Sequence, residues 1–539
     1  MTLQFALPQL SGSVVVNFDP AEAERWLADL PVLNAAESSH QLISALTRLN
    51  RQPLDDKTRL RLLELYRRPV HIVCAEQQRR YLGLPLPLPQ DSRLVAERVH
   101  QFQVEMAYGY KRIVLGFSES SERGPEATPE LALATQRAIR YLTLGIGRSY
   151  ELYAPVPEGT WREVHELYRY AETKGITAVP VDDALNAAIA HSSIGHAYKQ
   201  ALLLGFSDPY HLPAQLLQKI DQYLDAYAPL AQITPVMAAL KAECQFLVSL
   251  ESDRAGIVDT ENLRFTTDSQ YRLLDTVGLV LTMHEQLSAL RNGEQPTPDA
   301  LGKDFYANRG QEMLIRLITS WGVNPKRHFS RTPKDGAKAE VVHGIGNIIL
   351  CVNGGAAFTP STAEVGPQPE RREIGSQNAA PGAPADRKTV SGVPWILLDE
   401  SAGGFSLESS GAAGRHIQVG DLIAVRIVDL KTEWGIAVVR WARSSKSDQV
   451  EIGAQRLAPA AEPVAVAVNS PPGNNFAMAL RLPEIKPLRQ PQTLITPCGS
   501  FKPQRILILD DGFRTYQIRA TRLVNQTSSF DQFEFVFLD

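Results

Sequence analysis

Two short groups of polar residues in the second half of the chain have types and spacings suited to nucleotide binding. Arg327 and Arg331 are four positions apart, and guanidinium groups pair with phosphate oxygens and with the O6/N7 edge of guanine. Asp399 and Ser401 belong to a DxSxxG sequence that ends at Gly404. The carboxylate can accept from guanine N1–H and N2–H, the hydroxyl can donate or accept, and glycine permits close backbone approach and positive φ.

Each group alone is weak evidence, because arginines at this spacing and Asp–Ser–Gly turns are common on protein surfaces. Three further features follow in order. Phe405 stands directly after the last glycine, the strand-like segment 435–441 ends at Trp441, and a second strand-like segment spans 451–457. This combination resembles the PilZ domain family of bacterial cyclic di-GMP receptors over residues 321–460. The resemblance implies an antiparallel β-barrel that binds cyclic di-GMP.

The resemblance also implies which residues form the ligand site. Lys326 stands where some family members have arginine, which leaves the number of bound ligand molecules open. An insertion at 353–392 makes the stretch between the two groups longer than the family's usual short hairpin. This insertion holds an alternative arginine pair at 371–372, but no second arginine follows four residues after either. The implied cyclic di-GMP-binding residues are Lys326, Arg327, Arg331, Asp399, Ser401 and Gly404.

The first part of the chain, from residue 18 to about 320, carries the spacing of apolar side chains that is typical of amphipathic helices. Asp19 and Pro20 predict a helix start, because an acidic N-cap and a proline in the first turn favour one. We expect an all-α bundle or solenoid without a fixed-period repeat. Helices are expected at 38–50, 56–67, 93–109, 129–143, 160–174, 182–204, 212–226, 233–252, 269–292 and 310–320.

After Trp321 the pattern changes to alternating segments rich in valine and isoleucine, which predict strands. Residues 353–392 hold 18 Ala, Gly and Pro and one aromatic residue, so we expect a disordered insertion there. Strands are expected at 339–352, 395–398, 405–408, 421–428, 436–441 and 450–455, and then near 476–482, 492–496, 504–510, 514–524 and 533–538.

The predicted fold class is therefore multidomain α + β. An N-terminal all-α domain, 1–320, is followed by the PilZ-like antiparallel barrel, 321–469, and by a second small β module, 470–539. The length of 539 residues supports several domains, since single hydrophobic cores stop growing at roughly 250–300 residues.

Bulk composition excludes several other functions. The net charge of −4 gives no general attraction to DNA, RNA or anionic lipid. No run of 18 apolar residues exists and the first residues lack the pattern of a signal peptide, so we expect neither membrane insertion nor secretion. Four widely spaced cysteines without a CxxC pair argue against zinc and disulfides and favour reduced thiols in the cytoplasm.

Three near-matches to enzyme or metal motifs are better explained as structure. Residues 116–120 lack the second glycine of a nucleophile elbow, and 145–147 lack the third glycine of a dinucleotide motif. His191 and His196 are five apart, which does not place two zinc ligands on one helix face. We therefore predict a non-enzymatic cyclic di-GMP effector without a cofactor, whose helical domain binds an unknown protein partner. The alternative is a scaffold or chaperone-like assembly protein with a degenerate barrel that binds no nucleotide.

Overall fold

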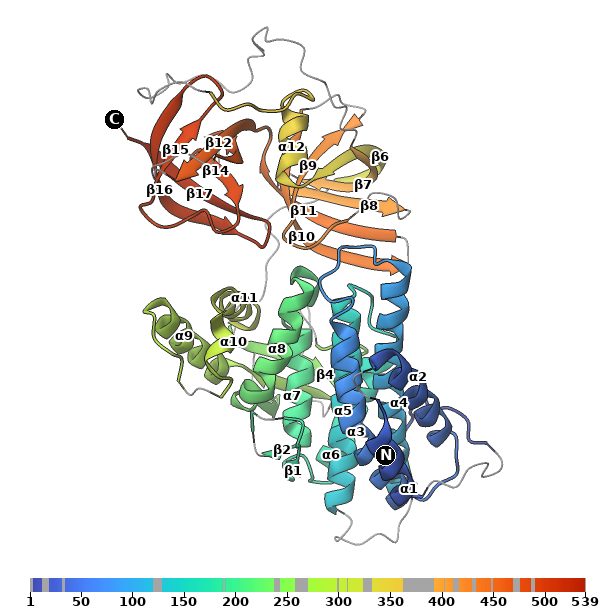
Figure 1. Ribbon diagram of the computed structural model, residues 1–539. Helices are drawn as coiled ribbons and strands as arrows, with labels where there is room; N and C mark the ends of the chain where they lie inside the picture. The colour runs from blue at the N-terminus through green and yellow to red at the C-terminus, as the bar shows by residue number, and fades with distance from the viewer. Residues whose placement is uncertain are drawn as a thin grey trace. The chain divides into compact units, whose positions relative to one another are not determined.

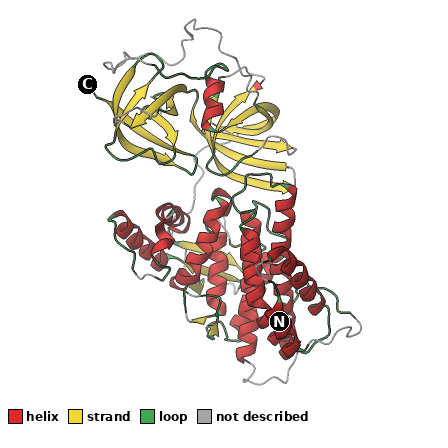
Figure 2. Ribbon diagram, viewed as in Figure 1, coloured by secondary structure: helices red, strands yellow, loops and turns green. Residues whose placement is uncertain are grey.

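The chain forms two compact units in the computed structural model (Figure 1). One unit contains Met1–Leu84 and Leu88–Lys326, and the other contains Pro85–Pro87 and Arg327–Asp539. Helices dominate the first unit and strands the second (Figure 2). The structure describes residues 3–11, 19–31, 34–119, 128–186, 188–189, 191–236, 243–256, 270–297, 300–307, 309–322, 332–361, 392–401, 403–410, 416–428, 433–446, 449–468, 476–485 and 490–538, with the backbone alone at 35, 303, 332–335, 410 and 445–446.

The helical unit is organised around one central helix that is buried along most of its length. The described helices are α1 (Pro20–Asp29), α2 (Ala35–Leu49), α3 (Asp56–Gln78), α4 (Gln90–Glu119), α5 (Thr128–Glu151), α6 (Thr160–Thr173), α7 (Ile194–Gly205), α8 (Ala214–Tyr227), α9 (Val277–Arg291), α10 (Lys303–Ala307) and α11 (Gly310–Gly322), with 3-10 turns at Pro209–His211 and Ala228–Leu230. The central helix is α5, which packs against α4, α6, α7 and α8. Its alanines and glycines keep the neighbouring helices close.

Two helix starts follow directly from the local sequence. The Asp19 carboxylate accepts a hydrogen bond from the Ala21 N–H at 3.1 Å, and Pro20 occupies the first helical position, as predicted. The Asp55 carboxylate likewise accepts from the Thr58 N–H at 2.9 Å. This hydrogen bond lowers the pKa of Asp55 below its usual range. Each cap satisfies a backbone N–H that has no partner inside the helix.

The helical unit is not all-α, which corrects part of the prediction. A three-stranded antiparallel sheet has the order β3-β5-β4, and β1 pairs with β2. The expected helices at 182–204, 233–252 and 269–292 are therefore wrong over the strand residues. Short apolar runs of four to eight residues do not distinguish strand from buried helix by periodicity. The strands are β1 (Val181–Asp182), β2 (His191–Ser192), β3 (Gln232–Pro235), β4 (Gln245–Ser249) and β5 (Tyr271–Asp275).

The middle of the chain forms a closed barrel of six antiparallel strands. Its strands are β6 (Thr332–His343), β7 (Val393–Ser401), β8 (Gly404–Ser410), β9 (Leu422–Ile427), β10 (Gly435–Lys446) and β11 (Gln449–Ala458). The order around the barrel is β10-β11-β8-β7-β6-β9. The predicted strands after residue 392 are confirmed in type and close to their expected limits.

The connection from β6 to β7 differs from its prediction. Residues 339–352 were expected as one strand, but Gly344, with φ +83°, ends β6 and the chain continues as α12 (Ile345–Val352). Ile348 and Ile349 bury this helix in a hydrophobic core. Of the expected disordered insertion, residues 353–361 are instead placed, with Phe358 packed against the same core. Residues 362–391 lie outside the described part of the chain.

The C-terminal part is a second closed antiparallel barrel. Its strands are β12 (Glu462–Val468), β13 (Ala477–Leu482), β14 (Thr493–Pro497), β15 (Ile506–Asp510), β16 (Thr515–Gln526) and β17 (Phe530–Phe537). The order is β12-β13-β14-β17-β16-β15, and β12 pairs with β13 and β15. This barrel thus begins before the expected boundary at residue 470. Numbered one to six along the chain, the strands of both barrels follow the same cyclic order, 1-2-3-6-5-4.

The two barrels share one hydrophobic core. The middle barrel contributes residues of β9, β10 and β11, including Ile436 and Val438, and α12 contributes Ile348. The C-terminal barrel contributes Leu480 and Phe530, among others. A shared buried core of this kind holds the barrels together as parts of one unit.

Candidate functional site

The DxSxxG residues lie at a tight hairpin between β7 and β8. Asp399 and Ser401 are at the end of β7, and Gly404 is the first residue of β8. Ser401 pairs with Gly404 across the hairpin, and Asp399 pairs with Ser406. Both polar side chains are half-buried, so they are fixed by the sheet and still accessible from solvent.

Gly404 has a structural role that differs from the expected one. A Cβ at this position would lie 2.0 Å from the carbonyl oxygen of Ala454 on β11, so glycine is required for β8 and β11 to approach. Its φ is not in the left-handed region, so the positive φ that glycine permits is not used at this position. The close backbone contact at Gly404 is thus made by the neighbouring strand.

Arg327 and Arg331, called the arginine motif from here on, lie outside the described residues, and so does Lys326. The strand that follows it is well defined, however. Thr332, the first residue of β6, pairs with Glu400, and Pro333 pairs with Asp399. Successive Cα atoms are about 3.8 Å apart, so Arg331 is one peptide away from a residue that pairs with the DxSxxG strand. The strand that begins directly after Arg331 therefore lies beside the strand that carries Asp399.

A row of residues extends from Asp399 across the sheet. Asp399 pairs with Ser406, Ser406 pairs with Gly453, and Gly453 pairs with Trp441 on β10. Directly paired residues of antiparallel strands project to the same face. A Cβ on Gly453 would lie 1.9 Å from Trp441 Nε1, so the indole lies over this glycine. The face that holds Asp399 therefore includes a half-buried aromatic ring on which a purine could stack.

One arginine on β10 lies beside this face, and one on β11 contacts the adjoining hairpin. The guanidinium of Arg443 lies 5.6 Å from the centre of the Trp441 ring. Arg456 forms an ion pair of 2.8 Å with Glu400 and lies 4.4 Å from the ring centre of Phe405. Its backbone N–H also donates to the carbonyl of Gly403 at 2.9 Å. These contacts fasten β11 to the hairpin that carries the DxSxxG sequence.

Sequence reasoning identified Trp441 only as a strand signature and did not consider Arg456 at all. Neither residue is close in sequence to the two motifs. The glycine at position 453, twelve residues after the tryptophan, was the one available signal, because a glycine inside a strand indicates close approach of another group. The strand register shows that the group approaching Gly453 is the indole of Trp441.

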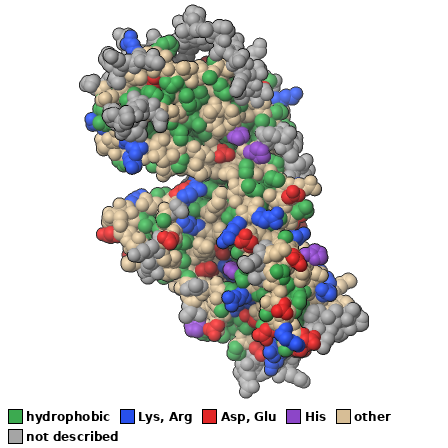
Figure 3. Space-filling model, in the orientation of Figure 1, with side chains coloured by type: hydrophobic (Ala, Val, Ile, Leu, Met, Phe, Trp, Pro, Cys, Tyr) green, Lys and Arg blue, Asp and Glu red, His purple; other side chains and the backbone are tan. Residues whose placement is uncertain are grey.

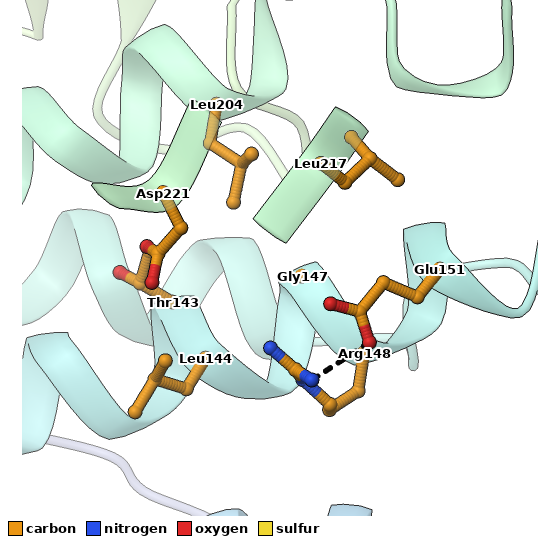
Figure 4. Close-up of a pocket in the computed structure, with 8 residues that line it drawn as sticks. All are labelled: Thr143, Leu144, Gly147, Arg148, Glu151, Leu204, Leu217 and Asp221. Carbon is orange, nitrogen blue, oxygen red and sulfur yellow. Dashed lines mark ion pairs between the residues drawn. The ribbon is translucent and has the colours of Figure 1, made fainter. Parts of the chain in front are cut away.

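The helical unit offers a small polar cavity that does not suit a nucleotide. Its volume is about 10 Å³, enough for one water molecule, and Arg148 and Glu151 form an ion pair of 2.7 Å at its edge (Figure 4). Burial raises the pKa of Glu151 to about 7 against the opposing effect of Arg148. The lining residues are Thr143, Leu144, Gly147, Arg148, Glu151, Leu204, Leu217 and Asp221.

The residues that the sequence analysis rejected as enzyme or metal motifs have ordinary structural surroundings. The Ser118 hydroxyl donates to the Leu115 carbonyl within α4, and Gly145 and Gly147 lie inside α5. His196 is buried, which lowers its pKa to about 4. His191 instead contacts Asp182 at 2.6 Å on the surface. The described residues hold no cluster of potential metal ligands.

The surface charge follows the near-neutral composition. On the face shown in Figure 3, acidic and basic side chains of the helical unit are intermixed and do not gather by sign. In the part of the chain that the structure describes, no helix is long and apolar enough to cross a membrane.

Comparison with known proteins agrees with the fold and the motifs. The middle barrel carries a PilZ domain: a family model described as "Cyclic-di-GMP receptor FimW, middle PilZ domain" matches residues 363–463. Models described as the N-terminal domain of the same receptor and as the "FimW C-terminal beta-barrel domain" match 21–238 and 464–538. The match to the middle domain includes the DxSxxG sequence and begins after the arginine motif and β6.

One relative resembles the chain over nearly its whole length. The chain is 27% identical, over 582 aligned positions, to the cyclic-di-GMP receptor FimW of Pseudomonas aeruginosa (strain PAO1). The alignment covers 99% of this chain and 93% of the relative. The likeness therefore includes the helical unit and both barrels, in the same order.

Proposed function

We propose that the middle barrel of this chain binds cyclic di-GMP and that the chain is a non-enzymatic effector of this messenger. The observation that carries the proposal is the register of β6 and β7. It pairs Pro333 with Asp399, so a strand that begins one residue after Arg331 lies beside the DxSxxG strand. The register supports a site in which residues that are far apart in sequence contact one ligand. The name of the relative agrees with this ligand.

The chemistry of the site suits the two halves of the ligand. Arg327 and Arg331 supply guanidinium groups for phosphate oxygens and guanine, with Lys326 as an additional cation. Asp399 accepts from guanine N1–H and N2–H, and Ser401 offers a hydroxyl. Gly404 contributes indirectly, because it lets β8 approach β11 and so sets the shape of the hairpin. The messenger is a ligand here, and no cofactor is needed for binding.

Titration calorimetry with the full chain tests the proposal. We expect wild-type protein to bind cyclic di-GMP, and Asp399→Ala to weaken binding by about 5- to 150-fold, the equivalent of the 1–3 kcal/mol expected for a charge-assisted contact. Glu484→Ala removes an exposed carboxylate just after β13, the matching strand of the C-terminal barrel, and serves as the control. Absence of binding by wild-type protein at high-micromolar ligand would favour the scaffold with a degenerate barrel.

We further propose that the helical unit relays the signal to a protein partner. The exposed apolar side chains Val277 and Leu281 of α9 and Ile315 of α11 support this role, since α9 and α11 pack together and hold these side chains out to solvent. Leu281→Ser should leave ligand affinity unchanged and reduce ligand-dependent capture of the partner. A variant that captures the same protein equally well would contradict this use of the surface.

None of the four cysteines, all of which lie within the described residues, forms a disulfide in the structure, which is consistent with a reducing compartment. We propose a cytoplasmic location, where the thiols stay reduced. Labelling of the thiols in intact cells by a membrane-impermeant reagent would contradict it.

A further inference from the structure

A β-bulge places one more arginine beside the candidate site. On β10, Val439 pairs with Ala454 and Trp441 pairs with Gly453, so Arg440 is an extra residue between two consecutive pairs. A bulge of this kind bends the strand and redirects a side chain, and bulges are common next to functional sites. In this barrel the bulge lies next to the tryptophan of the candidate site.

The redirected side chain is held by a neighbour that belongs to the same face. Arg440 Nε donates to Gln455 Oε1 at 2.7 Å. Gln455 pairs with Gly404, and Gly404 pairs with Ser401 of the DxSxxG sequence. Gln455 is exposed, so this hydrogen bond lies at the surface of the barrel and orients the guanidinium there.

The strand register also sets how far this arginine lies from the DxSxxG sequence. Gln455, which holds the Arg440 guanidinium, is on β11, and only β8 separates it from Ser401 on β7. Two inter-strand spacings of about 4.8 Å therefore separate Gln455 from Ser401 by at most about 10 Å along the wall of the closed barrel. Cyclic di-GMP carries two guanines on one ring that holds two phosphates. A ligand of this size, held by Asp399 and Ser401 on β7, would present its other half toward Trp441 and Arg440.

We propose that Arg440 is a further ligand-contacting residue, aimed by Gln455, that reads the O6/N7 edge of a guanine lying on the Trp441 side of the site. The proposal rests on the proposed function and adds a determinant of specificity to it. Arginine is the side chain that pairs with both guanine acceptors at once, whereas adenine presents an amino donor in place of O6. Arg440 therefore favours guanine over adenine. Gln455 is a positioning residue, because it acts through Arg440.

Calorimetry on the full chain tests the contact itself. We expect Arg440→Ala to weaken cyclic di-GMP binding at least fivefold and Arg440→Lys to recover only part of the loss, since lysine lacks the fork. Arg519→Ala is the control, because Arg519 is an exposed arginine on β16, the topological counterpart of β10. Thermal unfolding without ligand shows whether each variant folds. If wild-type protein binds and folded Arg440→Ala binds equally well, the inference is wrong while the proposed function stands; if wild-type protein does not bind, the proposed function itself fails.

Two additional readouts separate recognition from a structural role. Competition between cyclic di-GMP and cyclic di-AMP should show a smaller preference for the guanine ligand in Arg440→Ala than in wild type. Gln455→Ala should weaken binding less than Arg440→Ala, and adding it to Arg440→Ala should cause no further loss, because both act through one contact. An unchanged guanine preference, or additive losses in the double variant, would overturn the assignment.

Discussion

The two barrels of this chain have the same strand order and different surfaces. In both, strands one to six follow the cyclic order 1-2-3-6-5-4. In the middle barrel, two residues join the second and third strands, and the DxSxxG sequence spans that turn. In the C-terminal barrel the same connection runs from Leu482 to Thr493 and holds no such sequence. The same barrel topology thus carries the motif of the proposed ligand site in one copy and lacks it in the other, because binding depends on particular side chains and not on the fold.

The ladder between the third and sixth strands shows the same contrast. In the middle barrel, β8 and β11 contain Gly404 and Gly453, which admit the Ala454 carbonyl and the Trp441 indole. The corresponding strands of the C-terminal barrel, β14 and β17, contain no glycine and are rich in threonine and phenylalanine. Absence of a side chain at two positions is therefore as much a part of the site as the polar residues.

The largest difference between the barrels should come from the arginine motif. We expect the double variant Arg327→Ala, Arg331→Ala to reduce cyclic di-GMP affinity by about 30-fold or more, because two charge-assisted contacts of about 1–3 kcal/mol each are lost. The matched double variant Arg514→Ala, Arg519→Ala changes exposed arginines of β16 and its preceding turn. It should bind as wild type does in the same calorimetric titration. Equal losses in both would show that general positive charge, not the motif, drives binding.

The strand contact at Gly404 should make the middle barrel sensitive to a single methyl group. Gly404→Ala should lower the free energy of unfolding by about 1–3 kcal/mol or more, because the added Cβ collides with the backbone of β11. Urea denaturation measures the effect. Gly435→Ala on β10 is the control, since its Cβ would meet nothing closer than 3.7 Å. A Gly404→Ala protein as stable as this control would contradict the account of the β8–β11 contact.

The stoichiometry of the middle barrel should depend on Lys326. We predict two cyclic di-GMP molecules per chain, since a third cation beside the two arginines helps to offset the four phosphates of a ligand pair. Lys326→Ala should reduce the calorimetric stoichiometry toward one, while Lys502→Ala of the C-terminal barrel should leave it at two. One ligand bound per wild-type chain would refute the prediction.

The smallest effect on binding is expected from the insertion in the middle barrel. Replacing residues 362–391 by a ten-residue glycine–serine linker should change the dissociation constant by less than about twofold, because this stretch has too few large apolar residues to build a site. Phe358→Ser, just before it, should instead lower stability, as Phe358 packs on the shared core. Loss of binding in a folded deletion variant would mean that the insertion is part of the site.

The sequence itself determined the fold class and the chemistry of the site. Alternating apolar residues predicted most strands of both barrels, since a strand with one buried face has a period of two, but β12 and the first half of β6 were missed. The order of the arginine motif, the DxSxxG sequence and the Trp441 strand was sufficient for the PilZ resemblance. Periodicity failed where a short apolar run is compatible with either a strand or a buried helix. For this reason β4 and β5 were expected as helix, and α12 was expected as strand.

Tertiary structure alone decided which distant residues meet. Trp441, Gln455 and Arg440 join Asp399 on one face only through the register of four neighbouring strands, and a shift of one residue would turn each side chain to the other face. The requirement for glycine at 404 likewise comes from β11, whose approach no local pattern encodes. Local sequence carries backbone preference and chemical type, whereas contacts between separate strands depend on how the whole barrel closes.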